Sequence, residues 1–296
     1  MNSFDKDEVA QDALAKTGNA CARWRQWLAP WTRRRVIAAL AASAPALART
    51  QAPAAQERIG IVLLHGIGAT GASMEPLAAR WRAQGWQVVT PDLPYGGPAA
   101  FSRPVAEGER VVREALQRLR REGAQKLVLA GFSIGGFFAA HVASRERVDA
   151  LVAIAPNGGA DMKRLEDEVA RARQLIAQGR GDQPTPMKDA AVVGTERYDL
   201  PGAVPSAWLT WFDPAGTMNW QRVWRALPSG VPVFLVVPTR DLENLRRVKQ
   251  ALWEGLPPHP GHRLYEPRSD HLGAPLASAD EAVRWLRQTL QAAAAR

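Results

Sequence analysis

The sequence contains only one cysteine, Cys21, among its 296 residues. A single cysteine cannot form an intramolecular disulfide, and it cannot supply a cysteine-based metal cluster. Cysteine content therefore says nothing about the compartment in which the protein works. That information has to come from other parts of the chain.

Phosphate-binding loops and the residue spacings of metal sites are also lacking. The glycine-rich segment GIGATG at 66–71 leaves a dinucleotide site as an alternative that we do not favour. We expect neither a metal ion nor an organic cofactor.

Basic residues outnumber acidic ones, and the formal net charge is +9. They do not form a block, because arginines alternate with glutamates along 107–123 and again along 167–174. This pattern is typical of solvated helix faces, and we predict no nucleic-acid partner. An anionic partner such as a membrane surface remains the alternative.

An export signal is predicted for residues 1–48. Residues 32–37, TRRRVI, match a twin-arginine signal, and they are followed by an apolar stretch at 36–48 that ends in ALA, a plausible cleavage site. The stretch is too short to span a bilayer, which needs about 20 apolar residues, so no stable membrane insertion is expected after cleavage. We expect a periplasmic or secreted protein in which 49–57 is a linker. The alternative is an amphipathic N-terminal helix on a cytoplasmic enzyme.

Six short apolar runs alternate with segments of helical periodicity in the rest of the chain. The runs are 59–64, 86–90, 126–130, 150–155, 231–237 and 262–266. Continuously apolar strands joined by helices are typical of a parallel sheet covered on both faces. We therefore predict an α/β fold with a mostly parallel, doubly wound sheet of about six strands.

One connection in this pattern is much longer than the others. More than seventy residues, 157–230, separate the fourth and fifth apolar runs. They are too many for a loop in a compact domain. We interpret them as an inserted helical cap, and the core domain as 58–156 together with 231–296.

The segment Gly131-Phe132-Ser133-Ile134-Gly135 lies between a predicted strand and a predicted helix. G-x-S-x-G in this context predicts a nucleophile elbow, in which a sharp turn exposes the serine hydroxyl. Side chains at 131 or 135 would collide with the crossing strand and helix, which explains the two glycines. The N–H of Ile134, at the start of the helix, would then face the serine as an oxyanion donor.

With this elbow, the chain resembles the α/β-hydrolase family over about residues 57–292. LLHGIG at 63–68 looks like the family's oxyanion loop, and the match implies the N–H of Ile67 as a second oxyanion donor. The resemblance also implies that partners of Ser133 follow in the order acid, then histidine. A chain starting near Arg49 leaves no room for the two strands that precede this loop in larger members, so six strands are expected rather than eight.

His271 is the candidate general base among five histidines. His65 precedes the serine, and His141 lies eight residues into the elbow helix, pointing away from it. His259 and His262 lie in a turn before the last apolar run, whereas His271 follows that run in RSDHLGAP, which is similar to the family's histidine loop.

Asp241 is the candidate acid, because it follows the fifth apolar run and lies thirty residues before His271. The segment resembles the family's strand–G-x-x-D motif, although Pro238 replaces the glycine. Glu243 is the rival acid. Asp270 is expected to orient the histidine loop.

Ser133, His271 and Asp241 together predict acyl transfer by a serine hydrolase acting on a small-molecule carboxylic ester. A peptidase, amidase or acyltransferase with the same triad is an alternative, as is a non-catalytic binding protein of the same fold. The sequence does not predict the oligomeric state. Four aromatic residues of the insertion are expected either to line an apolar substrate pocket or to form the core of the cap: Trp208, Trp211, Phe212 and Trp220.

Overall fold

The computed structural model describes residues 58–98, 100–157, 165–193 and 196–294, all within a compact unit that spans Pro53–Arg296. The expectations for the leader and linker at 1–57 lie outside these residues.

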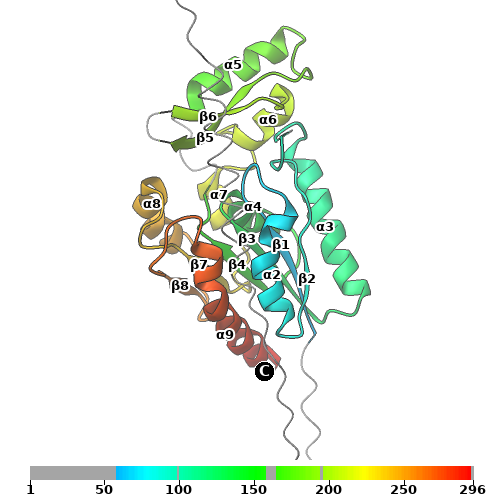
Figure 1. Ribbon diagram of the computed structural model, residues 1–296, viewed down its shortest axis with the longest axis vertical. Coiled ribbons are helices and arrows are strands. Elements are labelled where there is room, and N and C mark those ends of the chain that lie inside the picture. Colours follow the sequence, from blue (N-terminus) through cyan, green and yellow to red (C-terminus); the bar gives the residue numbers. More distant parts are fainter. Residues whose placement is uncertain (1–57, 99, 158–164, 194–195, 295–296) are drawn as a thin grey trace, which may run out of the picture. The chain divides into compact units, whose positions relative to one another are not determined.

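A six-stranded sheet forms the centre of this unit, in the order β2-β1-β3-β4-β7-β8 (Figure 1). All five pairs of neighbouring strands are parallel. The strands are β1 Ile59–Leu64, β2 Gln87–Val89, β3 Lys126–Phe132, β4 Ala150–Ile154, β7 Val233–Val236 and β8 Arg263–Tyr265. Each coincides with one of the six apolar runs, so the predicted fold class and strand number are confirmed.

The middle of the sheet is buried on both faces. Every residue of β1, β4 and β7 is buried. Helix–strand crossovers allow this, because they place helices on both sides of a parallel sheet. Continuously apolar sequence, rather than alternation, is the consequence.

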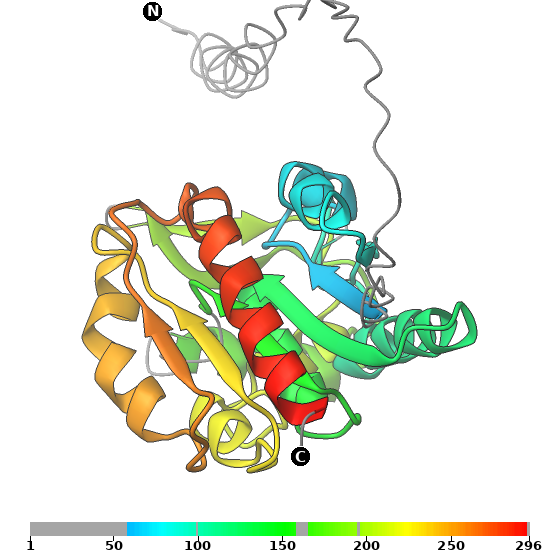
Figure 2. The same cartoon turned by 90° about the horizontal axis from the view of Figure 1, so that it is seen from below.

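Helices cover both faces of the sheet. α2 (Glu75–Arg82) packs with α9 (Ala274–Ala294), and α9 also contacts β4 and β7. Figure 2 shows α9 crossing the strands on this face. α3 (Val105–Arg121) and α4 (Ile134–Ala143) contact β1 and β3 from the other side, and α8 (Glu243–Glu254) connects β7 to β8. A short 3₁₀ helix, η2 (Gly71–Met74), precedes α2.

The insertion between β4 and β7 contains strands as well as helices. Its elements are α5 Glu166–Ala177, β5 Met187–Val193, β6 Glu196–Leu200, α6 Pro205–Phe212 and α7 Trp220–Arg225. The antiparallel pair β5 and β6 was not predicted, because that part of the sequence is a mixture of proline, glycine and charged residues without clear alternation. Figure 1 shows α5, β5, β6 and α6 together at one end of the sheet, at the top of the view.

Aromatic side chains join α6 to the rest of the core. The Trp211 ring lies 5.4 Å from that of Tyr95 and 5.1 Å from that of Phe138, measured between centroids. The Trp208 and Phe212 rings pack against each other in a tilted arrangement, with centroids 4.7 Å apart. Trp208, Trp211 and Phe212 are fully buried, whereas Trp220 is half-buried. The burial of Trp208, Trp211 and Phe212 favours the alternative in which these three side chains are part of a core, and a pocket-lining role for Trp220 stays a prediction.

No helix among the described residues combines the length and the apolar character that crossing a bilayer would need.

A core substitution tests the packing of the sheet. Leu235 of β7 is completely buried, so Leu235→Ala is expected to lower the free energy of unfolding by about 2–5 kcal/mol through lost burial and a residual cavity. Urea titration measures this change. Leu272 is 81% exposed, and Leu272→Ala serves as the control with a change below about 0.5 kcal/mol. Equal effects of the two substitutions would contradict the packing described here.

Candidate active site

Ser133 occupies a sharp turn between the last residue of β3 and the first residue of α4. Its backbone has φ +56° and ψ −125°, which is a strained conformation for a residue with a side chain. Only three non-glycine residues with positive φ occur in the described part of the chain, and Ser133 is one of them. The backbone conformation expected of a nucleophile elbow is present.

The two glycines of the motif allow the strand, the turn and the helix to cross at close range. A Cβ atom on Gly131 would lie 2.2 Å from the carbonyl oxygen of Gly135. One on Gly135 would lie 2.4 Å from the carbonyl oxygen of His65. Both distances are shorter than any real Cβ contact, so neither position accepts a side chain without movement of the backbone.

His271 links the serine to a carboxylate. Its Nε2 lies 3.0 Å from Ser133 Oγ, and its Nδ1 lies 2.7 Å from Asp241 Oδ1. The Phe132 ring packs against the imidazole with a centroid separation of 4.9 Å. The structure thus brings together the three side chains that the sequence analysis selected from distant parts of the chain.

Hydrogen bonds between the two loops that follow β7 and β8 hold Asp241 beside His271. Thr239 N–H donates to the Pro267 carbonyl at 3.0 Å, and Arg240 N–H donates to the Ser269 carbonyl at 3.0 Å. Arg240 and Asp270 form a parallel bridge. The pairing of these two neighbouring strands therefore continues beyond their ends. Asp241 and His271 are the next residues of the two paired segments, so their side chains lie close together.

Asp241 is buried and partly satisfied by its own loop. Its Oδ1 also accepts the N–H of Leu242 at 2.6 Å, while Oδ2 is buried with no partner among the described residues. The N–H of Asp241 donates to the Pro238 carbonyl at 3.2 Å, which closes a turn that proline accommodates. Pro238, at the position where the family motif has glycine, therefore leaves the Asp241 carboxylate within hydrogen-bond distance of the His271 imidazole.

The other acidic candidates have different positions. Glu243 is exposed at the first position of α8. Asp270 Oδ1 accepts the N–H of Gly273 at 2.8 Å, a contact within the histidine loop that fits its expected orienting role.

The backbone N–H groups of Ile67 and Ile134, beside Ser133, have no acceptor within the described part of the chain. Ile134 is the first residue of α4, where N–H groups lack intrahelical partners. Gly66 lies against the serine, since a Cβ on it would be 3.7 Å from Ser133 Cβ. Both groups come from segments that adjoin Ser133, and their role as oxyanion donors remains a prediction.

His65 stabilises the loop that carries Ile67. Leu93 N–H donates to His65 Nε2 at 3.1 Å, and His65 Nδ1 donates to the Gly66 carbonyl at 2.7 Å. One nitrogen accepts and the other donates, so the imidazole is neutral. Burial lowers its pKa, in agreement with this state.

The glycine-rich segment 66–71 has the glycine spacing of a dinucleotide-binding loop, but the N–H groups of two of its glycines donate to other parts of the protein. Gly68 N–H donates to the Tyr95 carbonyl at 2.9 Å, and Gly71 N–H donates to Asp92 Oδ1 at 2.7 Å. A Cβ on Gly71 would lie 1.9 Å from the Thr90 carbonyl oxygen. These contacts favour a structural role for the glycines.

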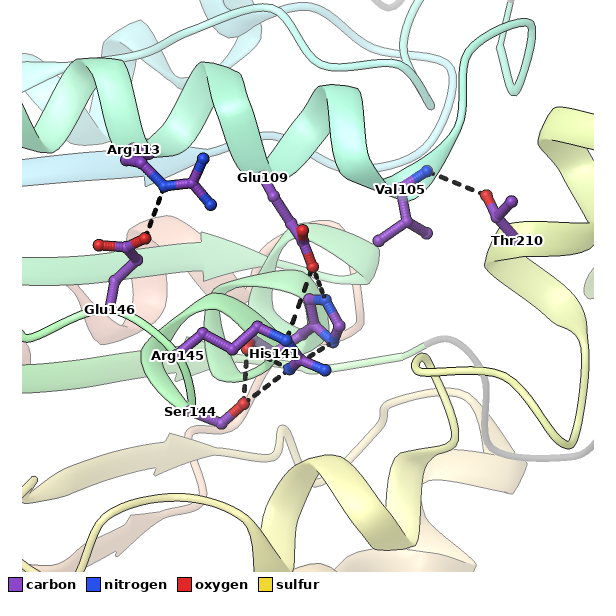
Figure 3. A network of polar contacts seen from close by, with 8 residues as sticks. All are labelled: Val105, Glu109, Arg113, His141, Ser144, Arg145, Glu146 and Thr210. Carbon is purple, nitrogen blue, oxygen red and sulfur yellow. Dashed lines mark hydrogen bonds and ion pairs between the residues drawn. The ribbon is translucent and has the colours of Figure 1, made fainter.

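His141 joins α4 to α3 in a network of polar contacts (Figure 3). Its Nε2 donates to Glu109 Oε1 at 2.6 Å, and Arg145 Nη1 donates to its Nδ1 at 3.2 Å. The ring is completely buried, and burial lowers its pKa below the usual histidine value. Both ring nitrogens of His141 thus form hydrogen bonds, one with Glu109 and the other with Arg145.

The remaining histidines lie in the turn before β8. Val233 N–H donates to His262 Nδ1 at 3.0 Å, and His262 Nε2 donates to the Pro257 carbonyl at 2.7 Å. His259 Nδ1 accepts the N–H of Gly261 at 2.9 Å. The imidazole of His271, by comparison, contacts both the hydroxyl of Ser133 and the carboxylate of Asp241.

The arrangement can transfer a proton from a hydroxyl to a neutral imidazole whose other nitrogen faces a carboxylate. In the described ranges, no group of three histidine, cysteine, aspartate or glutamate side chains is arranged to hold a metal ion.

A model of the alpha/beta hydrolase family matches residues 61–285. The chain belongs to the alpha/beta hydrolase family. A search of curated protein sequences found no match.

Solved structures resemble this alpha/beta hydrolase at low sequence identity. The monoacylglycerol lipase of Paleococcus ferrophilus has a TM-score of 0.59 at 19% identity, over 78% of this chain and 94% of the lipase. A structure reported with the metagenome-derived lipolytic enzymes LipS and LipT has a TM-score of 0.57 at 17% identity, with the same two coverages. DcsB in complex with a substrate analogue has a TM-score of 0.60 at 15% identity, over 79% of this chain and 92% of DcsB. At these identities the likeness shows a shared fold.

Sequence reasoning missed the contact of Phe132 with the imidazole and the hydrogen bonds between the Asp241 and His271 loops. The only sequence feature that pointed to the Phe132 contact was the position of this residue inside the G-x-S-x-G motif, next to Ser133. Nothing in the sequence marks the second, because the donors and acceptors are backbone groups.

The buried neutral histidines predict loss of stability in acid. Burial lowers the folded-state pKa of His65, His141 and His262 below the ordinary histidine value of 6.5. As pH falls through 6.5, the unfolded chain binds protons that the folded protein does not, so stability is complete above that pH and decreases below it. Urea titrations at several pH values between 8 and 5 measure this decrease. His262→Gln should flatten the pH dependence, and wild-type stability that stays constant or rises toward acid would refute the account.

Proposed function

We propose that this alpha/beta hydrolase is a serine hydrolase that cleaves carboxylic esters through an acyl-enzyme intermediate. The observation that carries the proposal is the chain of contacts from Ser133 Oγ to His271 Nε2 at 3.0 Å and from His271 Nδ1 to Asp241 Oδ1 at 2.7 Å. The strained backbone of Ser133 supports it, because strain of this kind occurs mainly at functional sites.

In the first half of the proposed reaction, Ser133 Oγ attacks the ester carbonyl carbon while its proton passes to His271 Nε2. Asp241 accepts a hydrogen bond from the Nδ1–H of His271 and stabilises the imidazolium that forms. The N–H groups of Ile67 and Ile134 would donate to the oxyanion. Collapse of the tetrahedral intermediate releases the alcohol, which takes the proton from His271.

In the second half, water attacks the acyl-enzyme. His271 takes a proton from the water and returns it to Ser133 Oγ as the carboxylic acid leaves. The residues in this scheme are the triad and the two backbone donors. The scheme assigns no chemical step to the described residues of the insertion.

Two alternatives use the same fold. A peptidase, amidase or acyltransferase differs only in the leaving group or the acceptor, and the triad does not discriminate between them. Two of the three structural neighbours carry the names of lipolytic enzymes and of a monoacylglycerol lipase, which supports esters as the first substrates to test. A non-catalytic binding protein is disfavoured, because Pro238 does not prevent the contact between Asp241 and His271.

Substitution of the nucleophile is expected to abolish ester hydrolysis. Ser133→Ala should lower kcat by about 10⁶-fold, because triad residues act as a unit. Steady-state kinetics with p-nitrophenyl butyrate measures the loss. Ser144→Ala is the matched control and should retain wild-type kcat, because this serine just after α4 forms hydrogen bonds through its hydroxyl to Arg145 and the His141 carbonyl, away from the triad. Retention of the wild-type rate by Ser133→Ala would remove Ser133 from the mechanism.

The identity of the acid is tested in the same assay. Asp241→Asn should lower kcat by about 10⁴-fold through loss of the correct imidazole tautomer. Glu243→Gln, two positions along the chain and exposed, should leave kcat unchanged. A reversal of these two effects would make Glu243 the acid. Comparison of p-nitrophenyl esters with the matching anilides then separates an esterase from an amidase.

We also propose that residues 1–48 direct export through a twin-arginine route and are removed after Ala48. The observation behind this proposal is the sequence TRRRVI followed by a short apolar stretch. N-terminal sequencing of the periplasmic protein should give Arg49 or a near neighbour. Replacement of Arg33, Arg34 and Arg35 by lysine should retain the protein in the cytoplasm, and an intact Met1 on the wild-type protein in that fraction would contradict the proposal.

A further inference from the structure

Ser133 and Asp241 are connected by a second route, which does not pass through His271. This route consists of the residues Asn157 and Asn244, which lie 87 positions apart in the sequence. Neither residue belongs to the proposed triad, and neither was selected from the sequence.

The backbone of Ser133 is held by the end of β4. Its N–H donates to the Ile154 carbonyl at 2.9 Å, and its carbonyl accepts the N–H of Asn157 at 3.1 Å. The two bonds attach the strained serine to the neighbouring strand on both sides of its Cα atom. Movement of Asn157 would therefore move the residue that carries the nucleophile.

A second strained residue gives Asn157 this position. Ala155 has φ +46°, the third of the positive-φ residues that are not glycine in the described ranges. Its N–H donates to the Val236 carbonyl of β7 at 2.8 Å, so the sheet still holds it at this point. The left-handed conformation is unfavourable for alanine, and more so before Pro156, which restricts the preceding residue. The bend turns the chain out of β4 and returns the N–H of Asn157 to Ser133.

The side chain of Asn157 contacts the helix that follows Asp241. Asn244 Nδ2 donates to Asn157 Oδ1 at 3.1 Å, and both residues are half-buried. Asn244 lies in the first turn of α8, three positions after Asp241. The same turn is attached to the acid, since Arg246 Nε donates to the Asp241 carbonyl at 3.0 Å.

We infer that Asn157 and Asn244 form a positioning pair that fixes the distance between the nucleophile elbow and the acid loop. The inference rests on the proposed function, because it concerns the geometry of the same triad. The pair and the triad close a ring of contacts: Ser133, His271 and Asp241 on one side, and α8, Asn244 and Asn157 on the other. Loss of the amide contact lets the elbow and the acid loop separate, and small displacements of reacting groups lower the rate of the chemical step.

A double-mutant cycle tests the pair. Asn157→Ala and Asn244→Ala should each lower kcat for p-nitrophenyl butyrate by about ten- to a hundredfold, with little change in KM, because substrate contacts are untouched. The double variant should be no slower than the slower single variant, since both substitutions remove the same hydrogen bond. Asn157→Asp keeps an oxygen acceptor for Asn244 Nδ2 and should retain most of the wild-type kcat.

Asn219→Ala is the matched control for a purely structural asparagine. Asn219 caps α7 in the insertion, where its side chain accepts the N–H of Arg222. Its substitution should lower the melting temperature while kcat of the folded enzyme stays at the wild-type value.

Three results would overturn the positioning role: wild-type kcat in both single variants, effects that multiply in the double variant, or a loss of kcat that follows the loss of folded protein. Failure of the proposed function is recognised separately. In that case wild type and Ser133→Ala would hydrolyse the ester at the same rate. The positioning role would then be rejected together with the proposed function.

Discussion

The structure of the candidate site depends on the conformation of one residue. Ser133 has a positive φ, and the chain crosses so closely around it that the positions of Gly131 and Gly135 leave no room for a Cβ atom. A backbone held in this way keeps the hydroxyl at the end of β3 rather than inside the sheet. The same turn starts α4 and leaves the N–H of Ile134 without an intrahelical acceptor. The strain, the position of the hydroxyl and the lack of an intrahelical acceptor for the Ile134 N–H thus have a common origin.

The parallel sheet supplies the other two members of the proposed triad. β7 and β8 are neighbours at one edge, and the hydrogen bonds between their loops continue after the strands have ended. Asp241 and His271 therefore meet although thirty residues separate them. Their position relative to Ser133 depends on contacts across β4, which lies between β3 and β7. The bend at Ala155 and the contact between Asn157 and Asn244 lie at that point.

Local sequence patterns predicted much of this arrangement. The six strands were recognised because buried parallel strands are continuously apolar, and the elbow because its glycines have fixed spacing around the serine. His271 and Asp241 were selected through chain order and a family resemblance, and the structure places them in hydrogen-bond contact with each other and, through His271, with Ser133. For the strands and the elbow, the information lies within a few neighbouring residues.

Other features depend on contacts between distant residues and were not predictable. The pair of β5 and β6 lacks clear alternation, and its strands are recognised only from their pairing. The aromatic residues of α6 were consistent with a pocket lining or with a core, and their burial against Tyr95 and Phe138 was decided by tertiary packing. Asn157 and Asn244 look like ordinary loop and helix residues until the fold brings them together.

The central claim is that the strained Ser133, paired with His271, is a reactive nucleophile in the folded protein. Reaction with a fluorophosphonate followed by peptide mass spectrometry tests it most directly, because the reagent modifies activated serines without any assumption about the substrate. The account predicts one adduct, on the peptide that contains Ser133, and no adduct when the protein is first unfolded in urea. Folded protein that carries no adduct on Ser133, or carries it on another serine, would contradict the account.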